Sequence, residues 1–409
     1  MRPVASILLG SGFSIPEGIP GVGELNNRLK AIDESEIIIH TDMHAFFLDG
    51  QVDLNRGANR DERVFLQEFL EFYNAEVLKS GEQFHYETFF DYYSRYLHDG
   101  ENAAEIEQFC DQFNDRHLYK DYHRKSASAR MDAFDRSFQQ LVAGKLHKSK
   151  YFEDVNLSGY PQYGAFISFI GELLKAHNVK VHTLNHDIFF DFLGRSHDTL
   201  WQHFSDGYEL VGSRFYGKLL HTFQHRGGPV SKCYTVKLER FVDKFDTSLC
   251  LFKLHGSINS YVVTANELSG KPVRLKGNFA VSQYKMEYED PDTGKSTMIH
   301  LADRVQPDFL SGTTNKIRYY SSDPFYQSMF KYFQNNLMQS ELLVVIGYGF
   351  QDAGINEFLE RCYLNYGKEV VVIDPCKPKS DLLDKYPTNH IHASLVDIPY
   401  SEYLKLLPS

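Results

Sequence analysis

The sequence predicts an α/β protein with a Rossmann-like, mostly parallel sheet that carries helices on both faces, plus an inserted helical region. Three observations support this prediction. Short apolar runs alternate with segments of helical spacing, which is typical of parallel sheets with crossover helices. A long stretch before residue 150 has helical spacing throughout. Glycine or polar residues follow each apolar run directly, as expected where strands end at a binding edge.

The apolar runs define the predicted strands. Each run is short, rich in Val, Ile and Leu and bounded by turn residues, so we expect burial on both faces of the sheet. In chain order, the predicted strands are residues 5–10, 179–184, 249–254, 342–346 and 369–373. The spacing of apolar residues between them predicts helices over residues 166–175, 188–193, 325–338 and 355–364.

Two insertions interrupt this alternation. Residues 32–150 carry apolar and aromatic side chains at helical spacing, and we expect no strand among them. Their many Phe and Tyr residues fit either a plain core or a surface that contacts another subunit. Residues 264–325 are rich in Gly, Pro, Asp and Thr, which predicts loops and short strands. The main α/β domain is therefore assigned to residues 1–31 and 151–409.

Composition limits the classes of partner. The chain has 409 residues, with 43 Lys and Arg against 54 Asp and Glu and a net charge of −11. Because no global basic field attracts nucleic acid, we expect no direct nucleic-acid binding. No apolar run approaches the roughly 20 residues of a membrane-spanning helix, so no membrane association is expected. Five scattered cysteines without a CxxC pair predict a reduced, cytoplasmic protein without a cysteine zinc site.

The residues that follow the predicted strands are the candidate functional residues. Because the carboxyl ends of parallel strands meet at one edge of the sheet, these segments are expected to converge on one cleft. In chain order, the segments are Gly10-Ser11-Gly12, Asn185-His186-Asp187, His255-Gly256-Ser257, Gly347-Tyr348-Gly349 and Asp374-Pro375.

Each segment has both a chemical and a purely structural interpretation. The amide N–H groups of a Gly10-Ser11-Gly12 turn can hold a phosphate, but a tight turn also needs glycine. His255 has a side chain whose ordinary pKa suits a general base, yet it equally fits a structural histidine. Asn185 can orient a hydroxyl or a water, and Asp187 can accept from a carboxamide. Either residue could instead cap the following helix.

The same segments resemble motifs of the sirtuin family, in the family's order. Gly10-Ser11-Gly12-Phe13-Ser14 with Gly18-Ile19-Pro20 resembles the GAG…S…GIP segment. Thr183 to Asp187 resembles the T-x-N-x-D motif, and His255-Gly256 resembles the catalytic histidine and the glycine after it. The remaining matches concern nucleotide contacts: Ile346 to Phe350 followed by Asp352 and Asn356, and Val371 to Pro375, which is similar to the adenosine-contacting segment.

The resemblance implies a specific set of roles. Asn185 and His255 would be catalytic, and Gly10, Ser11, Gly12 and Ser14 would hold the phosphates of NAD. The same comparison assigns Asp187 to the nicotinamide, and Gly347 and Asp374 to the adenosine side. No four-cysteine zinc ribbon can form, and Gly21-Val22-Gly23 stands where the family usually has Asp, Phe and Arg. We therefore expect no zinc, and protein deacylation is disfavoured.

The helical insertion resembles bacterial sirtuin-like proteins that degrade NAD in anti-phage immunity. That resemblance implies an NAD+ hydrolase that releases nicotinamide and ADP-ribose, works as a homo-oligomer, and in one arrangement pairs with a HerA-type ring ATPase. Three alternatives stay open. They are a sirtuin-type protein deacylase or ADP-ribosyltransferase, a non-catalytic subunit that binds NAD or ADP-ribose, and a nuclease acting with a partner.

Overall fold

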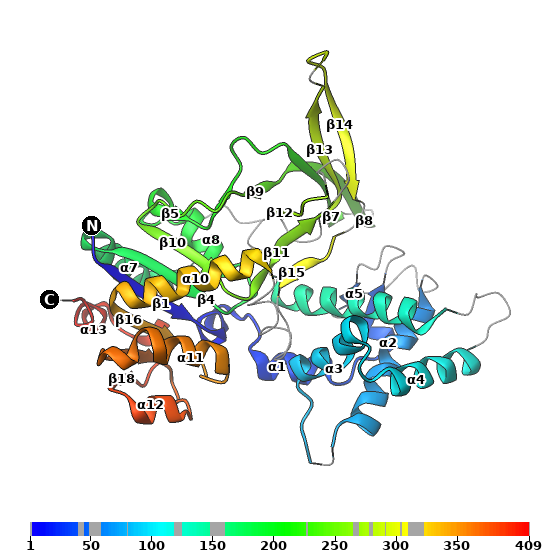
Figure 1. Cartoon of the computed structure of the whole chain (residues 1–409), viewed down its shortest axis with the longest axis horizontal. Helices are drawn as coiled ribbons and strands as arrows, with labels where there is room; N and C mark the ends of the chain where they lie inside the picture. The colour runs from blue at the N-terminus through cyan, green and yellow to red at the C-terminus, as the bar shows by residue number, and fades with distance from the viewer. Residues whose placement is uncertain are drawn as a thin grey trace. The chain divides into compact units, whose positions relative to one another are not determined.

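The computed structural model describes residues 2–39, 45–48, 59–79, 81–117, 125–147, 160–225, 228–264, 270–277, 281–290, 292–302, 305–309 and 323–408. The chain divides into two compact units (Figure 1). The sheet unit contains the described residues within 1–21, 147–309 and 317–409, and the helical unit contains those within 22–146. No helix among the described residues is long and apolar enough to cross a membrane.

A seven-stranded parallel sheet forms the centre of the sheet unit. Its strand order is β18-β17-β16-β1-β4-β10-β5, and every neighbouring pair is parallel. In that order the strands are Thr388–Ile391, Val370–Ile373, Ser340–Ile346, Val4–Leu9, Asn178–Thr183, Leu249–Lys253 and Phe204–Ser205. The predicted α/β, Rossmann-like fold class is confirmed, and all five predicted strands are present.

Both faces of the central strands are buried. Ile7 and Leu8 point to opposite faces of β1, and both are fully inaccessible to water. Leu8 shares a core cluster with residues of α10 and α11, whereas α7 packs against β4 and α13. The helices of this unit are α7 (Gly164–Ala176), α8 (Phe189–Ser196), α10 (Pro324–Gln339), α11 (Ala353–Cys362), α12 (Asp381–Lys385) and α13 (Tyr400–Leu404). Burial on both faces explains why these strands are continuous apolar runs in the sequence.

Two antiparallel sheets extend from the same unit. One has the order β15-β11-β12-β9-β6, with strands Pro307–Phe309, Gly256–Val263, Val273–Lys276, Glu239–Phe241 and Tyr208–Glu209. The other has the order β14-β13-β7-β8, with strands Ser296–Ala302, Val281–Glu289, Phe215–His225 and Gly228–Lys237.

The predicted insertion at 264–325 is more regular than the sequence indicates. Within it, β13 has nine residues and β14 has seven, so its strands are not all short. Both antiparallel sheets also recruit strands from outside the insertion, because β13 pairs with β7 and β12 pairs with β11 and β9. Local sequence composition cannot reveal such long-range pairing, which is decided by the cross-strand neighbours.

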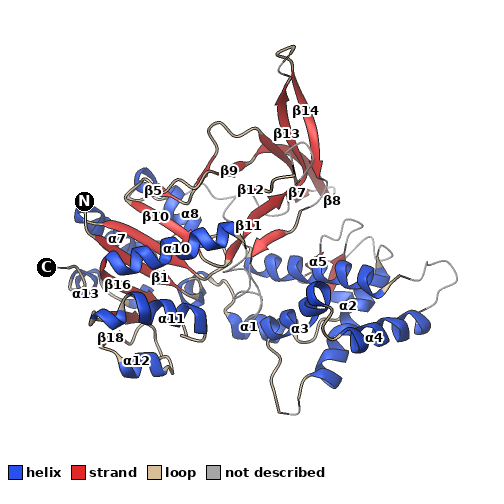
Figure 2. Cartoon of the chain, viewed as in Figure 1, coloured by secondary structure: helices blue, strands red, loops and turns tan. Residues whose placement is uncertain are grey.

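Among its described residues, the helical unit has five α-helices and one short strand pair (Figure 2). The helices are α1 (Val22–Leu29), α2 (Arg60–Phe72), α3 (Tyr86–Asp99), α4 (Ala103–Arg116) and α5 (Ala127–Leu146). The expectation that residues 32–150 contain no strand is wrong, because β2 (Ile37–Ile39) pairs with β3 (Ala45–Phe47). Three consecutive isoleucines favour a strand, since β-branched side chains pack well on a pleated surface.

The aromatic residues of the helical unit form its core. Phe65, Phe69, Phe89 and Phe134 are buried, and their rings meet at centroid distances of 4.9–6.3 Å, largely edge to face. Edge-to-face packing is favourable for aromatic pairs beyond the area it buries. These four side chains therefore belong to the core of the helical unit, while a contact with another subunit stays a prediction.

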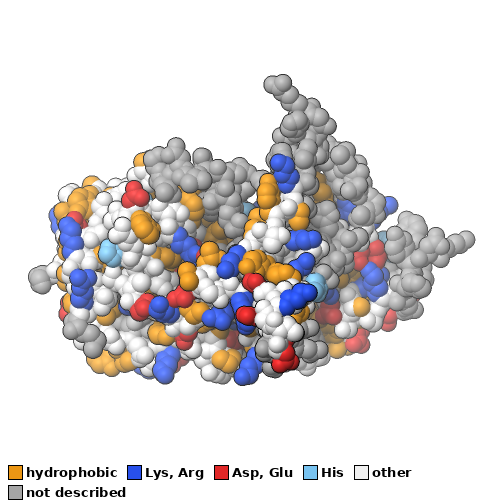
Figure 3. Space-filling model, turned by 90° about the horizontal axis from the view of Figure 1, so that it is seen from above, with side chains coloured by type: hydrophobic (Ala, Val, Ile, Leu, Met, Phe, Trp, Pro, Cys, Tyr) orange, Lys and Arg blue, Asp and Glu red, His pale blue; other side chains and the backbone are white. Residues whose placement is uncertain are grey.

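Charged residues of both signs are interspersed over the face seen in Figure 3, among its described residues. A mixed surface of this kind is consistent with the moderate net charge of −11.

Candidate functional site

The glycine loop after β1 interlocks with the loop after β16. The Gly10 amide donates to the Ile346 carbonyl at 2.9 Å, and the Gly12 amide donates to the Gly347 carbonyl at 3.0 Å. A Cβ atom on Gly10 would lie 2.5 Å from the Gly347 oxygen, and one on Gly12 would lie 2.6 Å from the Gly347 Cα. Packing alone thus requires glycine at Gly10 and Gly12. The same packing engages two of the amides in the turn that the sequence assigned to phosphate.

Asn185 joins the loop after β4 to this glycine loop. Its Nδ2 donates to the Gly10 carbonyl at 3.0 Å and to the Ser14 hydroxyl at 3.2 Å. Its backbone amide donates to the Thr183 hydroxyl at 3.0 Å, which fixes the start of the loop. Because both side-chain bonds use the nitrogen, the amide oxygen of Asn185 is the atom with no such partner among the described residues. That oxygen can accept a hydrogen bond from a hydroxyl or a water.

Asp187 is buried beneath Ser14. Its carboxylate accepts from the Phe189 amide at 2.9 Å, at the start of α8, and bonds to the Ser14 hydroxyl. Burial raises the pKa of the Asp187 carboxyl above its usual range, although the charge of Lys253 opposes this shift. This contact is a turn of the side chain onto the amide two residues ahead, whereas the N-cap residue of α8 is Ile188. Binding of a nicotinamide carboxamide by Asp187 stays a prediction.

His255 follows β10 at the same edge of the sheet. The Leu254 amide donates to the Thr183 carbonyl at 3.0 Å, and the Ile258 amide donates to the His186 carbonyl at 3.0 Å. The loops that carry Asn185 and His255 are therefore held side by side, and the rings of His186 and His255 lie 6.2 Å apart. His255 is only 3% exposed, and its Nε2 lies 3.5 Å from Oδ2 of Asp352.

Asp374 lies further along the edge, after β17. Its carboxylate accepts from the Cys376 amide at 2.9 Å, and its own amide donates to the Ile391 carbonyl at 3.2 Å. Beside it is an open hollow of about 570 Å³ between the segments that follow β16 and β17. Its lining includes Gln351, Asn356, Lys377 and Asp381. Donors and acceptors of this kind can hydrogen-bond a sugar or a base.

The structure therefore places all nine predicted site residues in the sheet unit, in segments that follow β1, β4, β10, β16 and β17. Main-chain hydrogen bonds connect the segments pairwise along the sheet, from Gly347 to Ile373 and from Leu184 to Leu9. One group is joined by hydrogen bonds and close packing, and it consists of Gly10, Gly12, Ser14, Gly347 and Asn185. Asp374 contacts its own turn instead.

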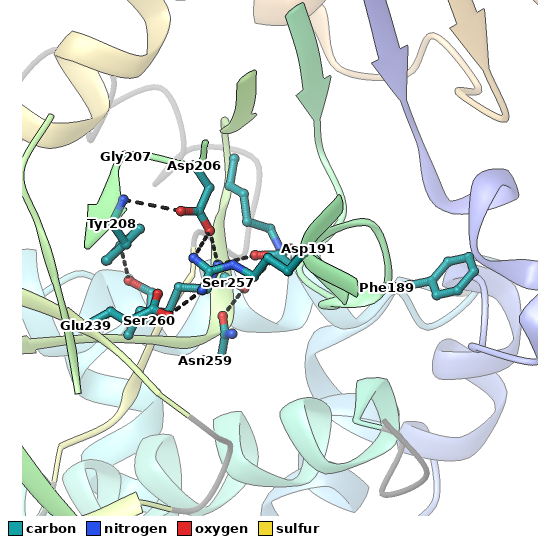
Figure 4. Close-up of polar contacts among 12 residues, drawn as sticks. Phe189, Asp191, Asp206, Gly207, Tyr208, Glu239, Ser257, Asn259 and Ser260 are labelled. Atoms are coloured by element: carbon teal, nitrogen blue, oxygen red, sulfur yellow. Dashed lines mark hydrogen bonds and ion pairs between the residues drawn. The ribbon is translucent and has the colours of Figure 1, made fainter. Parts of the chain in front are cut away.

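Sequence analysis missed a buried charge cluster, formed by Asp191, Asp206, Lys253 and Lys276. Asp191 binds both lysines, with 2.9 Å to the Lys253 nitrogen, and Lys276 also binds Asp206. Figure 4 shows Asp191 and Asp206 converging from separate segments on shared contacts. None of the four residues is more than 9% exposed. A signal was present, because Lys253 ends an otherwise apolar run, and a buried lysine requires a partner.

The two lysines decide the charge state of this cluster. Burial disfavours the ionised form of Asp191, but the ammonium groups of Lys253 and Lys276 outweigh it and hold the pKa of the Asp191 carboxyl well below its usual range. For Asp206, burial is likewise outweighed by Lys276 and Arg195, so its carboxyl pKa is also lowered. Both carboxylates are thus ionised at neutral pH. Lys253 also donates to Ser257, two residues after His255, at 2.9 Å.

The helical unit has an open hollow of about 1220 Å³ along α2 and α4, and its lining contains none of the predicted site residues. Among the described residues, no group of three or more His, Cys, Asp or Glu side chains is arranged to hold a metal ion.

No protein-family model matches the chain, and no curated protein matches it. Solved structures of Sir2 proteins do match over nearly the whole chain. A Sir2 protein with a p53 peptide and NAD+ is 10% identical, with a TM-score of 0.35, covering 99% of this chain and 93% of that one. An ADP-ribose complex of a mutant Sir2 homologue is 9% identical, with a TM-score of 0.35, covering 99% and 91%.

Proposed function

We propose that this protein is an NAD+ hydrolase that cleaves the nicotinamide–ribose bond and releases nicotinamide and ADP-ribose. One observation carries the proposal. The Asn185 side chain bonds to the glycine loop, and the adjoining loop presents His255 at the same sheet edge. Ligands of open parallel sheets bind outside the carboxyl ends of the strands. The order of the sirtuin-like motifs supports NAD as the ligand.

Cleavage of this bond requires few catalytic groups from the protein. Nicotinamide leaves from a pyridinium, so its departure neutralises a charge already present and needs no acid to protonate it. An ordinary glycoside needs two carboxyl groups, one of which protonates the leaving oxygen. Here one base and an orienting amide suffice. His255 takes the proton of the attacking water, directly or through a ribose hydroxyl, and the Asn185 oxygen orients that hydroxyl or water.

The remaining residues bind the rest of the dinucleotide. Ser11 offers its hydroxyl group to the phosphates, and Ser14, whose hydroxyl already bonds to Asp187 and Asn185, holds the phosphate-binding turn in place. Gly10 and Gly12 let this turn pack closely against Gly347. Gly347, Asp374 and the adjacent hollow receive the adenosine side. Asp187 holds Ser14 in place through a hydrogen bond and contributes to the nicotinamide pocket. This assignment needs neither zinc nor another metal.

The biological setting belongs to the same proposal. Hydrolysis of NAD+ harms the cell that contains it, so we infer a cytoplasmic anti-phage enzyme whose activity is gated. Assembly with further copies of the chain, or with a HerA-type ATPase, would supply that gate. Light scattering of the pure chain, alone and mixed with such an ATPase, measures both forms of assembly.

The deciding experiment follows free nicotinamide and ADP-ribose after NAD+ is added to the chain, with and without the ATPase. Because a general base contributes about 10²–10⁴-fold, His255→Ala should lower nicotinamide release by that factor. Asn185→Ala should also lower it. His203→Ala and Asn389→Ala, at exposed positions in the same unit, are the matched controls.

Other outcomes separate the alternatives. Release that requires an acyl-lysine peptide would identify a deacylase. Binding of ADP-ribose without any release of nicotinamide would identify a non-catalytic subunit. A folded His255→Ala protein with normal release would remove His255 from the mechanism.

A further inference from the structure

Asp352 is placed to act on His255 although the two residues come from different strand ends. His255 follows β10, and Asp352 lies between β16 and α11. Oδ2 of Asp352 is 3.5 Å from Nε2 of His255. This separation is within the range of an ion pair between a carboxylate and a protonated imidazole.

The rest of Asp352 is held rigidly, which fixes the direction of this carboxylate. Its other oxygen, Oδ1, accepts from the Ile355 amide at 3.1 Å and caps α11. Its backbone amide donates to the Tyr348 hydroxyl at 3.3 Å, and that hydroxyl also contacts the Asn356 side chain at 3.0 Å. One carboxylate oxygen thus serves the helix and leaves the other for the histidine. The Asp352 side chain is 19% exposed, so water screens the pair only in part.

We propose that Asp352 is a positioning residue for His255, which rests on the proposed function of His255 as the base. A carboxylate beside Nε2 favours the tautomer with its proton on Nε2, and it orients the ring for the transfer of a proton from the water or hydroxyl. It also stabilises the imidazolium that forms after that transfer. In this role Asp352 acts through His255 and takes no proton itself.

Among the described residues, the groups named next lie near His255 and differ from Asp352 in charge or in partner. His186 faces the ring at 6.2 Å between centroids and carries no negative charge. The hydroxyl of Tyr326 and the carbonyl of Asp308 lie against Gly256, the next residue. Lys253, two residues earlier, is bound to Asp191. Among these groups, Asp352 supplies the carboxylate.

The test variant is Asp352→Asn. Asparagine caps helices about as well as aspartate, so α11 keeps its cap while the charge is removed. Asp323→Asn is the matched control, because Asp323 caps α10 in the same unit by accepting from the Phe325 amide at 2.8 Å. Asp352→Ala, which removes both functions, shows how much of any effect comes from the cap.

The first readout does not depend on activity. In protein with isotope-labelled histidine, an NMR titration follows the pKa of His255, with its signal assigned through His255→Gln. An opposite charge at this distance raises a histidine pKa, so Asp352→Asn should lower the pKa by about one unit and Asp323→Asn should not change it. An unchanged His255 pKa in Asp352→Asn would overturn the proposal, even if the chain proved to be an NAD+ hydrolase.

The second readout is kinetic. Asp352→Asn should lower kcat for nicotinamide release about tenfold or more, a part of the general-base contribution, with the KM for NAD+ little changed. In a His255→Ala background the same change should cost nothing further, because the two residues act as a unit. Equal losses in both backgrounds would make Asp352 merely structural. If wild-type protein releases no nicotinamide, the proposed function fails, and the titration alone decides whether the pair exists.

Discussion

The phenylalanine core of the helical unit and the buried charge cluster of the sheet unit are equally shielded from water, yet they consist of opposite kinds of side chain. Phe69 and Phe89 are fully buried among other rings. Asp191 and Lys276 are at most 5% exposed and bind each other. The aromatic core gains from each ring that leaves water, whereas the cluster must first offset the cost of desolvating its charges.

This difference indicates that the charge cluster constrains the fold through the pairing of its charges, whereas the aromatic core constrains it mainly through the volume that it fills. Aromatic rings of similar size can replace one another with modest loss, but a buried ion tolerates no missing partner. The charge cluster lies directly behind the site edge, because Lys253 contacts Ser257 and the Asp187 carbonyl. We infer that the cluster fixes the loops that carry Asp187 and His255. Losing a cluster member should therefore affect stability and site geometry together.

The largest effect is expected from Asp191→Ala. This change leaves Lys253 and Lys276 with one carboxylate fewer between them, and breaking a buried ion pair in this way costs about 3–5 kcal/mol. Urea unfolding followed by the fluorescence of Trp201, the single tryptophan, reports on the sheet unit. Glu402→Ala, which breaks the exposed pair with Lys405, should leave the midpoint nearly unchanged. Equal midpoints for the two variants would show that the cluster is not needed for stability.

A second, smaller effect concerns pH. Burial lowers the pKa of His182 to about 3, and the ring stacks on Phe252 within the sheet unit. In the unfolded chain the residue titrates near 6.5, so between pH 6.5 and 3 the unfolded state binds a proton that the folded state does not. Stability is therefore fully present above pH 6.5 and is lost as the pH falls. From pH 7.5 to 5 the loss should be about 2 kcal/mol.

His182→Phe checks this assignment, because it removes the titrating ring but keeps an aromatic side chain in the stack. The pH dependence of the urea midpoint should become shallower. His147, whose pKa burial lowers to about 4, contributes with the same sign and should account for part of what remains. A variant with an unaltered pH dependence would contradict the role of His182.

The sheet was accessible to sequence analysis because its signal is local. Residues 342–346 and 370–373 are buried on both faces, so each strand is an unbroken apolar run followed by a turn. The convergence of Gly10, Asn185 and His255 followed from the rule that parallel strands end at one edge. In contrast, the extent of β13 depends on its pairing with β7 and β14, which no local pattern encodes.

The site was accessible only in part for the same reason. The residue types at the strand ends predicted its position, but not the bonds among them. That Gly10 and Gly12 direct their amides to Ile346 and Gly347 is a property of two loops far apart in the sequence. The contact of Asp352 with His255 is likewise tertiary. Lys253 is the exception, because a charged residue in an otherwise apolar run indicates from local sequence that a buried partner is present.

The smallest effect would sharpen the comparison of the two units most directly. Ile106 in α4 and Ile170 in α7 are both fully buried, one in each unit. Shortening either to valine removes one methylene and should cost about 0.5–1.5 kcal/mol. If the units unfold separately, Ile170→Val shifts the Trp201 transition and Ile106→Val does not, while hydrogen exchange in α4 shows the reverse. Coincident shifts in both measurements would mean that the two units unfold as one cooperative body, and that the aromatic core and the charge cluster stabilise each other.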